Sequence, residues 1–185
     1  MKKCFTTCFK RNKTKIPDVY VLLLENGKYY IGETLDKKKR ILNHKQGNGS
    51  AWTKQNKVLS EVKPITHKQA SFSELNETLE RFNLHGIDNV RGSMFTSPYS
   101  LRQSDKIMAA QLYCELKGFC RKCGRDDHFV GNCKSTDVAE WVHNFGGKLT
   151  TNTNISSRKC ANCSKDIQNL PKYFRFCSQC YNEGP

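Results

Sequence analysis

The segment 19–44 constrains the fold of this chain more than any other part of its sequence. Two strand-like runs in it flank Asn26-Gly27, and an Asn-Gly pair between such runs is a strong signal for a tight β-hairpin. Asp36 then stands where it can cap a helix that continues to about His44. The sequence therefore predicts a β-hairpin followed directly by a helix.

Hydrophobic periodicity extends this unit into a domain. Alternating apolar and polar residues at 58–65 predict a third, edge-like strand, whereas 47–53 (GNGSAWT) predicts a loop. Apolar residues at three- and four-residue spacing predict helices at 71–86 and 104–117. We therefore expect an α/β (α+β) domain at 18–118, with a small three-stranded antiparallel sheet flanked by helices, followed by two small zinc modules.

A first metal site is predicted by the spacing C-x2-C-x4-H-x4-C within 119–134. Its members are Cys120, Cys123, His128 and Cys133. Three thiolates and one imidazole complete the tetrahedral shell that structural zinc prefers. The spacing resembles the CCHC zinc knuckle of retroviral nucleocapsid proteins, except that Asp127 stands where those knuckles usually have glycine. This site could bind nucleic acid, or it could stabilise the preceding helix, and both roles remain open.

A second metal site is predicted near the C-terminus, in a module at 160–181. The spacing C-x2-C-x13-C-x2-C supplies four thiolates for a second structural Zn²⁺, from Cys160, Cys163, Cys177 and Cys180. The polar segment 146–159 before it predicts a flexible linker. Such modules bind nucleic acid, bind a protein partner or hold a terminus together, and these roles stay open.

The charge of the chain limits its partners. Lys and Arg number 31 against 17 Asp and Glu, so the net charge is +14, and a basic arm occupies 1–17. Such a field attracts polyanions, although it fits a solubilising surface equally well and does not separate DNA from RNA. The longest apolar run has six residues, far from the roughly 20 that span a bilayer. We expect a soluble intracellular protein, cytoplasmic or nuclear, with no membrane partner.

Two tyrosines on the hairpin, with an arginine and a histidine on the helix behind it, indicate phosphodiester chemistry. The hairpin resembles the GIY-YIG nuclease superfamily, because Tyr30-Ile31-Gly32 matches YIG outright and Tyr20 stands at the end of the GIY motif. One departure is Asp18, which takes the place of the glycine of GIY.

The resemblance continues through 18–117 in the family order. Arg40 and His44 follow Tyr30 by ten and fourteen residues, as in homing-type members of the superfamily. Glu77 on the next helix fits the metal-binding glutamate of the family, and Asn89 fits its terminal asparagine. Glu74 and Glu80 lie one turn to either side of Glu77, so the choice among the three carboxylates stays open.

The resemblance implies a metal-dependent endonuclease that hydrolyses DNA. Tyr20 would act as general base or position the water, with Tyr30 beside it. Arg40 would neutralise the scissile phosphate, and His44 would orient the water or a tyrosine hydroxyl. Glu77 would hold one Mg²⁺ or Mn²⁺, and Asn89 would brace the site.

Two other functions remain compatible with the sequence. The chain could be a non-catalytic, zinc-containing nucleic-acid-binding protein on a degenerate nuclease scaffold. Alternatively, the zinc-rich C-terminal third could be an adaptor that recruits a protein partner. Neither the preferred DNA, branched, nicked or of defined sequence, nor the oligomeric state is determined by these motifs.

Overall fold

The computed structural model describes residues 16–66 and 73–150, together with Cys160, Ala161, Cys163, Lys165, Gln179 and Cys180. Predictions for 1–15, 71–72, 151–159 and Cys177 lie outside these residues. With η marking a short 3-10 helix, the elements are β1 (Asp18–Leu24), η1 (Glu25–Gly27), β2 (Lys28–Thr34), α1 (Lys37–Lys45), α2 (Ala51–Gln55), β3 (Val58–Val62), α3 (Ser73–His85), η2 (Ile87–Asn89), β4 (Val90–Arg91), α4 (Gln103–Lys117), η3 (Val130–Asn132) and η4 (Glu140–Phe145).

The predicted hairpin is confirmed. Strands β1 and β2 pair antiparallel, and their register sets Tyr20 opposite Gly32. The chain turns through Asn26 at φ 60° and Gly27 at φ 67°. Positive φ at both central residues is what a type I′ turn requires, and its twist matches that of the flanking strands. The strands pair as far as Leu24 and Lys28, so the three residues Glu25–Gly27 join them and set the register that opposes Tyr20 to Gly32.

The sheet has four strands in the order β3-β1-β2-β4 rather than the three that we expected. The additional strand, β4, pairs parallel to β2 over two residues only. A strand this short has no periodicity to reveal it. It is anchored instead by the buried guanidinium of Arg91, which donates hydrogen bonds to four backbone carbonyls, those of Ile87, Val90, Ser97 and Tyr99.

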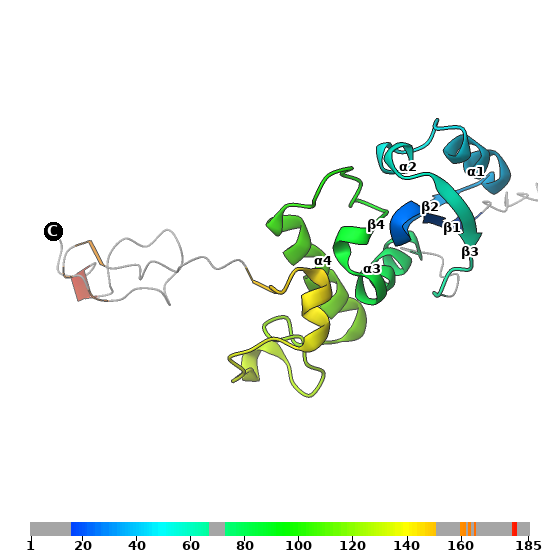
Figure 1. The fold of residues 1–185 in the computed structure, drawn as a ribbon. Coiled ribbons are helices and arrows are strands. Elements are labelled where there is room, and N and C mark those ends of the chain that lie inside the picture. The colour runs from blue at the N-terminus through cyan, green and yellow to red at the C-terminus, as the bar shows by residue number, and fades with distance from the viewer. Residues whose placement is uncertain are drawn as a thin grey trace, which may run out of the picture. The chain divides into compact units, whose positions relative to one another are not determined.

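Helices cover both faces of the sheet (Figure 1). Alternation along β1 sends Val19 and Val21 toward α3 and α4, where they join the larger apolar core. Tyr20 and Leu22 point to the opposite face and pack with Trp52 of α2, with Ile41 of α1 against them. Tyr20 and Tyr30 therefore lie on the face that α1 and α2 cover.

Local capping explains where the helices on this face begin. Lys39 N–H donates to the Asp36 carboxylate at 3.1 Å, so Asp36 caps α1 as predicted. Helix α2 lies where we expected only a loop. Its first turn is capped by the Ser50 hydroxyl, which accepts a hydrogen bond from Thr53 N–H at 3.3 Å. Five residues are too few for an apolar period, so only this cap marked the helix in the sequence.

The segment after α4 folds back onto the larger core. In η4, Phe145 contacts Phe82 edge to face, with ring centroids 5.8 Å apart, and Trp141 lies 5.0 Å from Tyr113. Leu149 is buried, and its carbonyl accepts from the Gln111 amide at 2.7 Å. The chain divides after this residue into two compact units, Met1–Leu149 and Thr150–Pro185.

Among the described residues, no helix is both long and apolar enough to cross a membrane.

Candidate active site and zinc centres

The Tyr20 hydroxyl contacts two of the residues that the sequence singled out, Arg40 and His44. It lies 2.9 Å from His44 Nε2 and accepts a hydrogen bond from Arg40 Nε at 3.2 Å. Arg40 and His44 are one turn apart on α1, so both project toward the face of β1 that carries Tyr20. The Tyr30 ring completes the group, with its centroid 4.8 Å from that of His44.

Two glycines give these side chains the room they occupy. A Cβ added at Gly32 would overlap the Tyr20 hydroxyl, and one added at Gly49 would overlap the His44 ring. Gly32 is the glycine of the YIG motif, and it lies opposite Tyr20 in the strand register. Its role here is steric, because the ring of Tyr20 occupies the space that a side chain at position 32 would need.

Burial sets the protonation of the cluster. It raises the pKa of Tyr20 to about 12, against the lowering effect of the Arg40 hydrogen bond. Burial, followed by the charge of Arg40, lowers the pKa of His44 to about 4. The hydrogen bond that Arg40 donates to Tyr20 raises the pKa of Arg40 above its usual value. Near neutral pH the cluster therefore holds a neutral tyrosine, a neutral imidazole and a guanidinium cation.

Glu77 lies elsewhere, inside the protein. It is fully buried, and one of its carboxylate oxygens accepts from Ile65 N–H and Thr66 N–H, both at 2.8 Å. The other oxygen accepts from Arg81 Nε at 2.9 Å. A carboxylate enclosed by these donors fastens the segment after β3 to α3. No hydrogen bond among the described residues joins Glu77 to the tyrosine cluster, and its expected metal-binding role stays a prediction.

Glu74, one turn earlier on α3, is the carboxylate whose charge contributes, after burial, to the raised pKa of Tyr20. Its charge acts on Tyr20, while Arg40 acts on it in return. Burial raises the pKa of Glu74, opposed by a hydrogen bond from Ser93 N–H to Oε1 at 2.7 Å. None of the other described residues engages Oε2. A half-buried carboxylate with one oxygen available, next to Glu33, fits a divalent cation, which prefers oxygen ligands.

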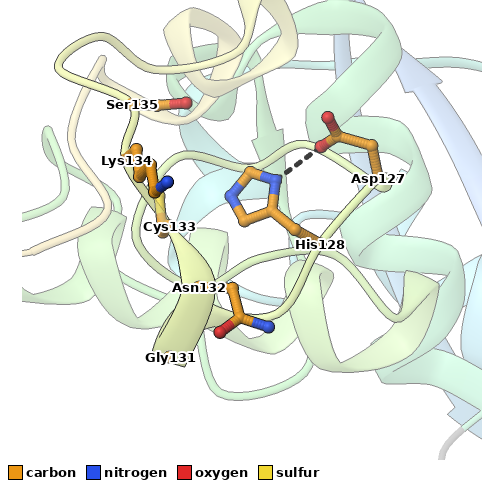
Figure 2. Close-up of a pocket in the computed structure, with 7 residues that line it drawn as sticks. All are labelled: Asp127, His128, Gly131, Asn132, Cys133, Lys134 and Ser135. Atoms are coloured by element: carbon orange, nitrogen blue, oxygen red, sulfur yellow. Dashed lines mark hydrogen bonds and ion pairs between the residues drawn. The ribbon is translucent and has the colours of Figure 1, made fainter.

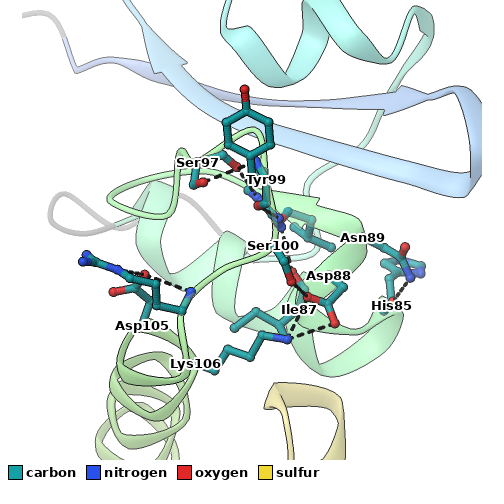
Figure 3. A network of polar contacts seen from close by, with 12 residues as sticks. His85, Ile87, Asp88, Asn89, Ser97, Tyr99, Ser100, Asp105 and Lys106 are labelled. Carbon is teal, nitrogen blue, oxygen red and sulfur yellow. Dashed lines mark hydrogen bonds and ion pairs between the residues drawn. The ribbon is translucent and has the colours of Figure 1, made fainter.

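Asn89 lies in η2, at the corner between α3 and β4, and its side chain is exposed. Its amide donates to the His85 carbonyl at 2.9 Å, which closes the last turn of α3 (Figure 3). Next to it, Asp88 forms an ion pair with Lys106 of α4 at 2.8 Å. These contacts hold the corner to two helices. Asn89 is thus not joined to the tyrosine cluster by any hydrogen bond among the described residues.

The CCHC residues converge into one cluster. The ligand atoms of Cys120, Cys123, His128 and Cys133 all lie within 4.8 Å of one another, as four ligands of one ion would. Backbone hydrogen bonds shape the first turn, with Gly124 N–H donating to the Cys120 carbonyl at 2.7 Å. The cluster could hold a zinc ion, because three thiolates and an imidazole match the ligand set of structural zinc.

Asp127 orients the histidine of this cluster. His128 Nδ1 lies 2.6 Å from the Asp127 carboxylate (Figure 2). Its Nε2 lies 3.4 Å from Cys123 Sγ. An ionised carboxylate can only accept a hydrogen bond, so Nδ1 carries the hydrogen and Nε2 is left for the metal. The departure from glycine noted in the sequence therefore supplies an orienting carboxylate, and an open depression lies beside it.

Within the described part of the second unit, three cysteines also lie together. Cys160, Cys163 and Cys180 place their sulfur atoms within 4.8 Å of one another and could hold a second zinc ion. The fourth expected ligand, Cys177, lies outside the described residues.

Residues 17–84 match the GIY-YIG catalytic domain family. The chain carries a GIY-YIG domain. The match runs from the start of β1 to the end of α3, so it contains Tyr20, Arg40 and His44 but ends before Asn89. No curated protein and no solved structure matched the chain.

Sequence reasoning missed two residues beside the tyrosine cluster, Ser50 and Thr53. Thr53 Oγ1 lies 2.8 Å from His44 Nδ1, and it donates to the Ser50 carbonyl at 3.0 Å. Both residues come from the segment taken for a loop. The signal that could have found them is the Ser-x-x-Thr pattern, in which a serine caps a short helix.

Proposed function

We propose that this protein is an endonuclease that hydrolyses DNA phosphodiester bonds with Mg²⁺ or Mn²⁺. The observation that carries this proposal is the position of the Tyr20 hydroxyl between Arg40 Nε and His44 Nε2. Membership of a nuclease domain family supports it. The net charge of +14 and the exposed lysines of α1, Lys38, Lys39 and Lys45, favour a polyanionic substrate.

Arg40 would bind the scissile phosphate. Its Nε is engaged by Tyr20, and the planar fork of a guanidinium suits phosphate oxygens. The hydrogen bond that raises its pKa also keeps the cation aimed from α1 toward the hydroxyl. Its charge would stabilise the developing phosphorane, which carries more negative charge than the bound phosphate.

Tyr20 and His44 would handle the proton of the attacking water. As the water oxygen forms its bond to phosphorus, the bond to the leaving deoxyribose oxygen breaks, and that oxygen takes a proton from solvent. The high pKa of Tyr20 means that the free protein stores no tyrosinate. The neutral imidazole of His44 can accept the hydroxyl proton as Tyr20 takes one from the water.

Glu74 would hold the divalent cation, with Glu33 on the neighbouring strand as a second source of negative charge. When bound, the cation neutralises charge on the leaving oxygen. We assign Glu77 a structural role, because its oxygens are occupied by Arg81 and by the backbone after β3. The two cysteine clusters offer the thiolate and imidazole ligands of structural sites, and we assign them structural Zn²⁺.

The test is nicking of supercoiled plasmid and of branched DNA by the purified protein with Mg²⁺ or Mn²⁺. Cleavage should require Mg²⁺ or Mn²⁺. It should stop when a chelator removes the ion, and it should stay absent when only zinc is returned. Arg40→Ala should also abolish it. Binding of DNA without cleavage of DNA or RNA by the wild-type protein would identify the non-catalytic binding protein instead. A chain lacking 160–185 separates the adaptor function, since naked DNA should still be cut while a protein partner is lost.

A matched pair of variants separates the two carboxylates of α3. Glu74→Gln should abolish cleavage with little change in stability. Glu77→Gln should leave the metal dependence of the remaining activity unchanged but lower the free energy of unfolding by about 2 kcal/mol, because a charged hydrogen bond to Arg81 is lost. Cleavage at several Mg²⁺ concentrations and urea unfolding measure the two effects. The reverse pattern would return the metal to Glu77.

A further inference from the structure

A buried chain of hydrogen bonds runs behind the Tyr20 hydroxyl. Tyr20 Oη contacts His44 Nε2 at 2.9 Å, and His44 Nδ1 contacts Thr53 Oγ1 at 2.8 Å. Thr53 Oγ1 in turn lies 3.0 Å from the Ser50 carbonyl oxygen. His44 and Thr53 are only 2% and 3% exposed, so water does not compete for these contacts. The chain links three separate elements, β1, α1 and α2.

Counting hydrogens gives this chain a direction. The Ser50 carbonyl can only accept, and it takes a hydrogen bond from Lys54 N–H at 3.1 Å as well as the hydrogen of the Thr53 hydroxyl. With that hydrogen on the carbonyl, Thr53 Oγ1 accepts from the Ser50 hydroxyl 3.2 Å away and from His44, which places the ring hydrogen on Nδ1. Nε2 is therefore the bare nitrogen, and it accepts from the Tyr20 hydroxyl. The Tyr20 oxygen keeps its remaining capacity for Arg40, which can only donate.

We propose that Thr53 is a positioning residue that fixes the tautomer of His44, so that a bare Nε2 faces the Tyr20 hydroxyl. This role rests on the proposed nuclease function for its effect on rate, but the tautomer itself does not. In the opposite tautomer, Nε2–H and Arg40 Nε–H would both point at the Tyr20 oxygen, and the Tyr20 hydrogen would be directed at neither partner.

The tautomer decides whether a proton relay exists. In the proposed direction, a proton leaves the attacking water for Tyr20 Oη as the hydrogen of Tyr20 passes to His44 Nε2. The imidazolium that results keeps its Nδ1–H bond to Thr53, and the phosphate bound by Arg40 supplies the opposing charge. With the hydrogen on Nε2, the same ring has no lone pair toward Tyr20, and the relay cannot start.

The surrounding backbone keeps Thr53 in place. Its N–H donates to the Ser50 hydroxyl at 3.3 Å, so Thr53 sits in the first, capped turn of α2. The backbone of Gly49 also lies against the His44 ring, where an added Cβ would overlap Nδ1. The ring therefore contacts α2 at Nδ1 and β1 at Nε2, and neither contact needs a conformational change.

The first measurement is direct and needs no variant. Long-range ¹H–¹⁵N spectra of the wild-type protein at pH 7 distinguish a protonated ring nitrogen from a bare one, and His44→Gln identifies the His44 signals. We expect protonated Nδ1 and bare Nε2. A protonated Nε2 in the free protein would overturn the proposal, whether or not the protein cleaves DNA.

The second measurement uses an isosteric pair. Thr53→Val keeps the shape but removes the hydroxyl, so His44 should populate both tautomers and cleavage should fall about 10- to 100-fold, as when other supporting partners of a catalytic group are removed. Thr53→Ser keeps the hydroxyl and should retain the wild-type tautomer and most of the rate. Equal losses in the two variants, or an unchanged His44 spectrum in Thr53→Val, would reject the positioning role while leaving the nuclease proposal intact.

Discussion

The two faces of the sheet differ in what covers them. On one face, α3, α4 and η4 build a thick core in which the rings of Phe82, Tyr113 and Phe145 contact one another or their neighbours edge to face or tilted. On the other face, the short helices α1 and α2 cover a small apolar cluster that includes Tyr20 and Trp52. Polar contacts among Tyr20, Arg40 and His44 take up the rest of that face.

This difference separates stability from chemistry. The thick face buries aromatic and aliphatic groups and connects to the CCHC cluster, whose Cys123 carbonyl accepts from Ala139 N–H at 2.7 Å. The thin face holds side chains in hydrogen-bonded positions that apolar packing alone would not specify. Loss of an apolar group from the thick face should therefore lower the folding free energy, whereas loss of the Tyr20 hydroxyl from the thin face should lower the rate of cleavage.

Removal of zinc from the CCHC cluster is the strongest test of the thick face. Cys123→Ser replaces a buried thiolate, and the free energy of unfolding of the first unit should fall by on the order of 5 kcal/mol or more, because zinc binding is coupled to folding. Thermal unfolding followed by circular dichroism, with metal analysis, measures this. Cys163→Ser in the second unit is the control and should leave that transition unchanged.

Tyr20→Phe tests the thin face. The variant keeps the ring in its cluster but removes the hydroxyl that joins Arg40 and His44, so cleavage should fall on the order of 1,000-fold with little change in melting temperature. Tyr29→Phe is the matched control, since Tyr29 points to the thick face and stacks on His85 at 4.1 Å. If both variants cut DNA at the wild-type rate, the thin face is not the reaction centre.

The pH dependence of stability is a smaller effect, in which His44 of the thin face changes the free energy of unfolding. His44 has a pKa near 4 in the folded protein, against 6.5 ordinarily, so only the unfolded chain binds a proton between these values. The stabilisation is present above pH 6.5 and is lost as the pH falls toward 4, by about 3 kcal/mol in total. Urea unfolding of wild type and His44→Gln across this range measures it. Parallel curves for the two proteins would exclude a buried neutral imidazole.

The sequence was most informative where local rules apply. The Asn-Gly turn, the cap at Asp36 and the spacing of Arg40 and His44 predicted the hairpin, α1 and two of the side chains that meet at Tyr20. Each depends on residues close together in the chain. The CCHC spacing was informative for the same reason, because its ligands follow one another within a single short segment.

What the sequence could not show depends on tertiary contacts. Glu74 and Glu77 are three residues apart on one helix, and only the packing of the segment after β3 decides which of them is enclosed. Likewise, Thr53 matters because it contacts His44 of α1, and β4 is held in place because Arg91 binds the carbonyls of the loop that follows it. No periodicity in a single sequence encodes such pairings.

Leu149 also determines when this protein can finish folding as it leaves the ribosome. The hairpin, α1, α2 and Val58 make the thin face from contiguous residues, whereas the thick face needs Phe145 and Leu149. At roughly 5–20 residues per second, the nascent chain spends about 5–20 s between these two stages. During that interval the thick-face side chains of β1 and β2 lack their final cover, so this is the stage at which a chaperone would have the most to bind.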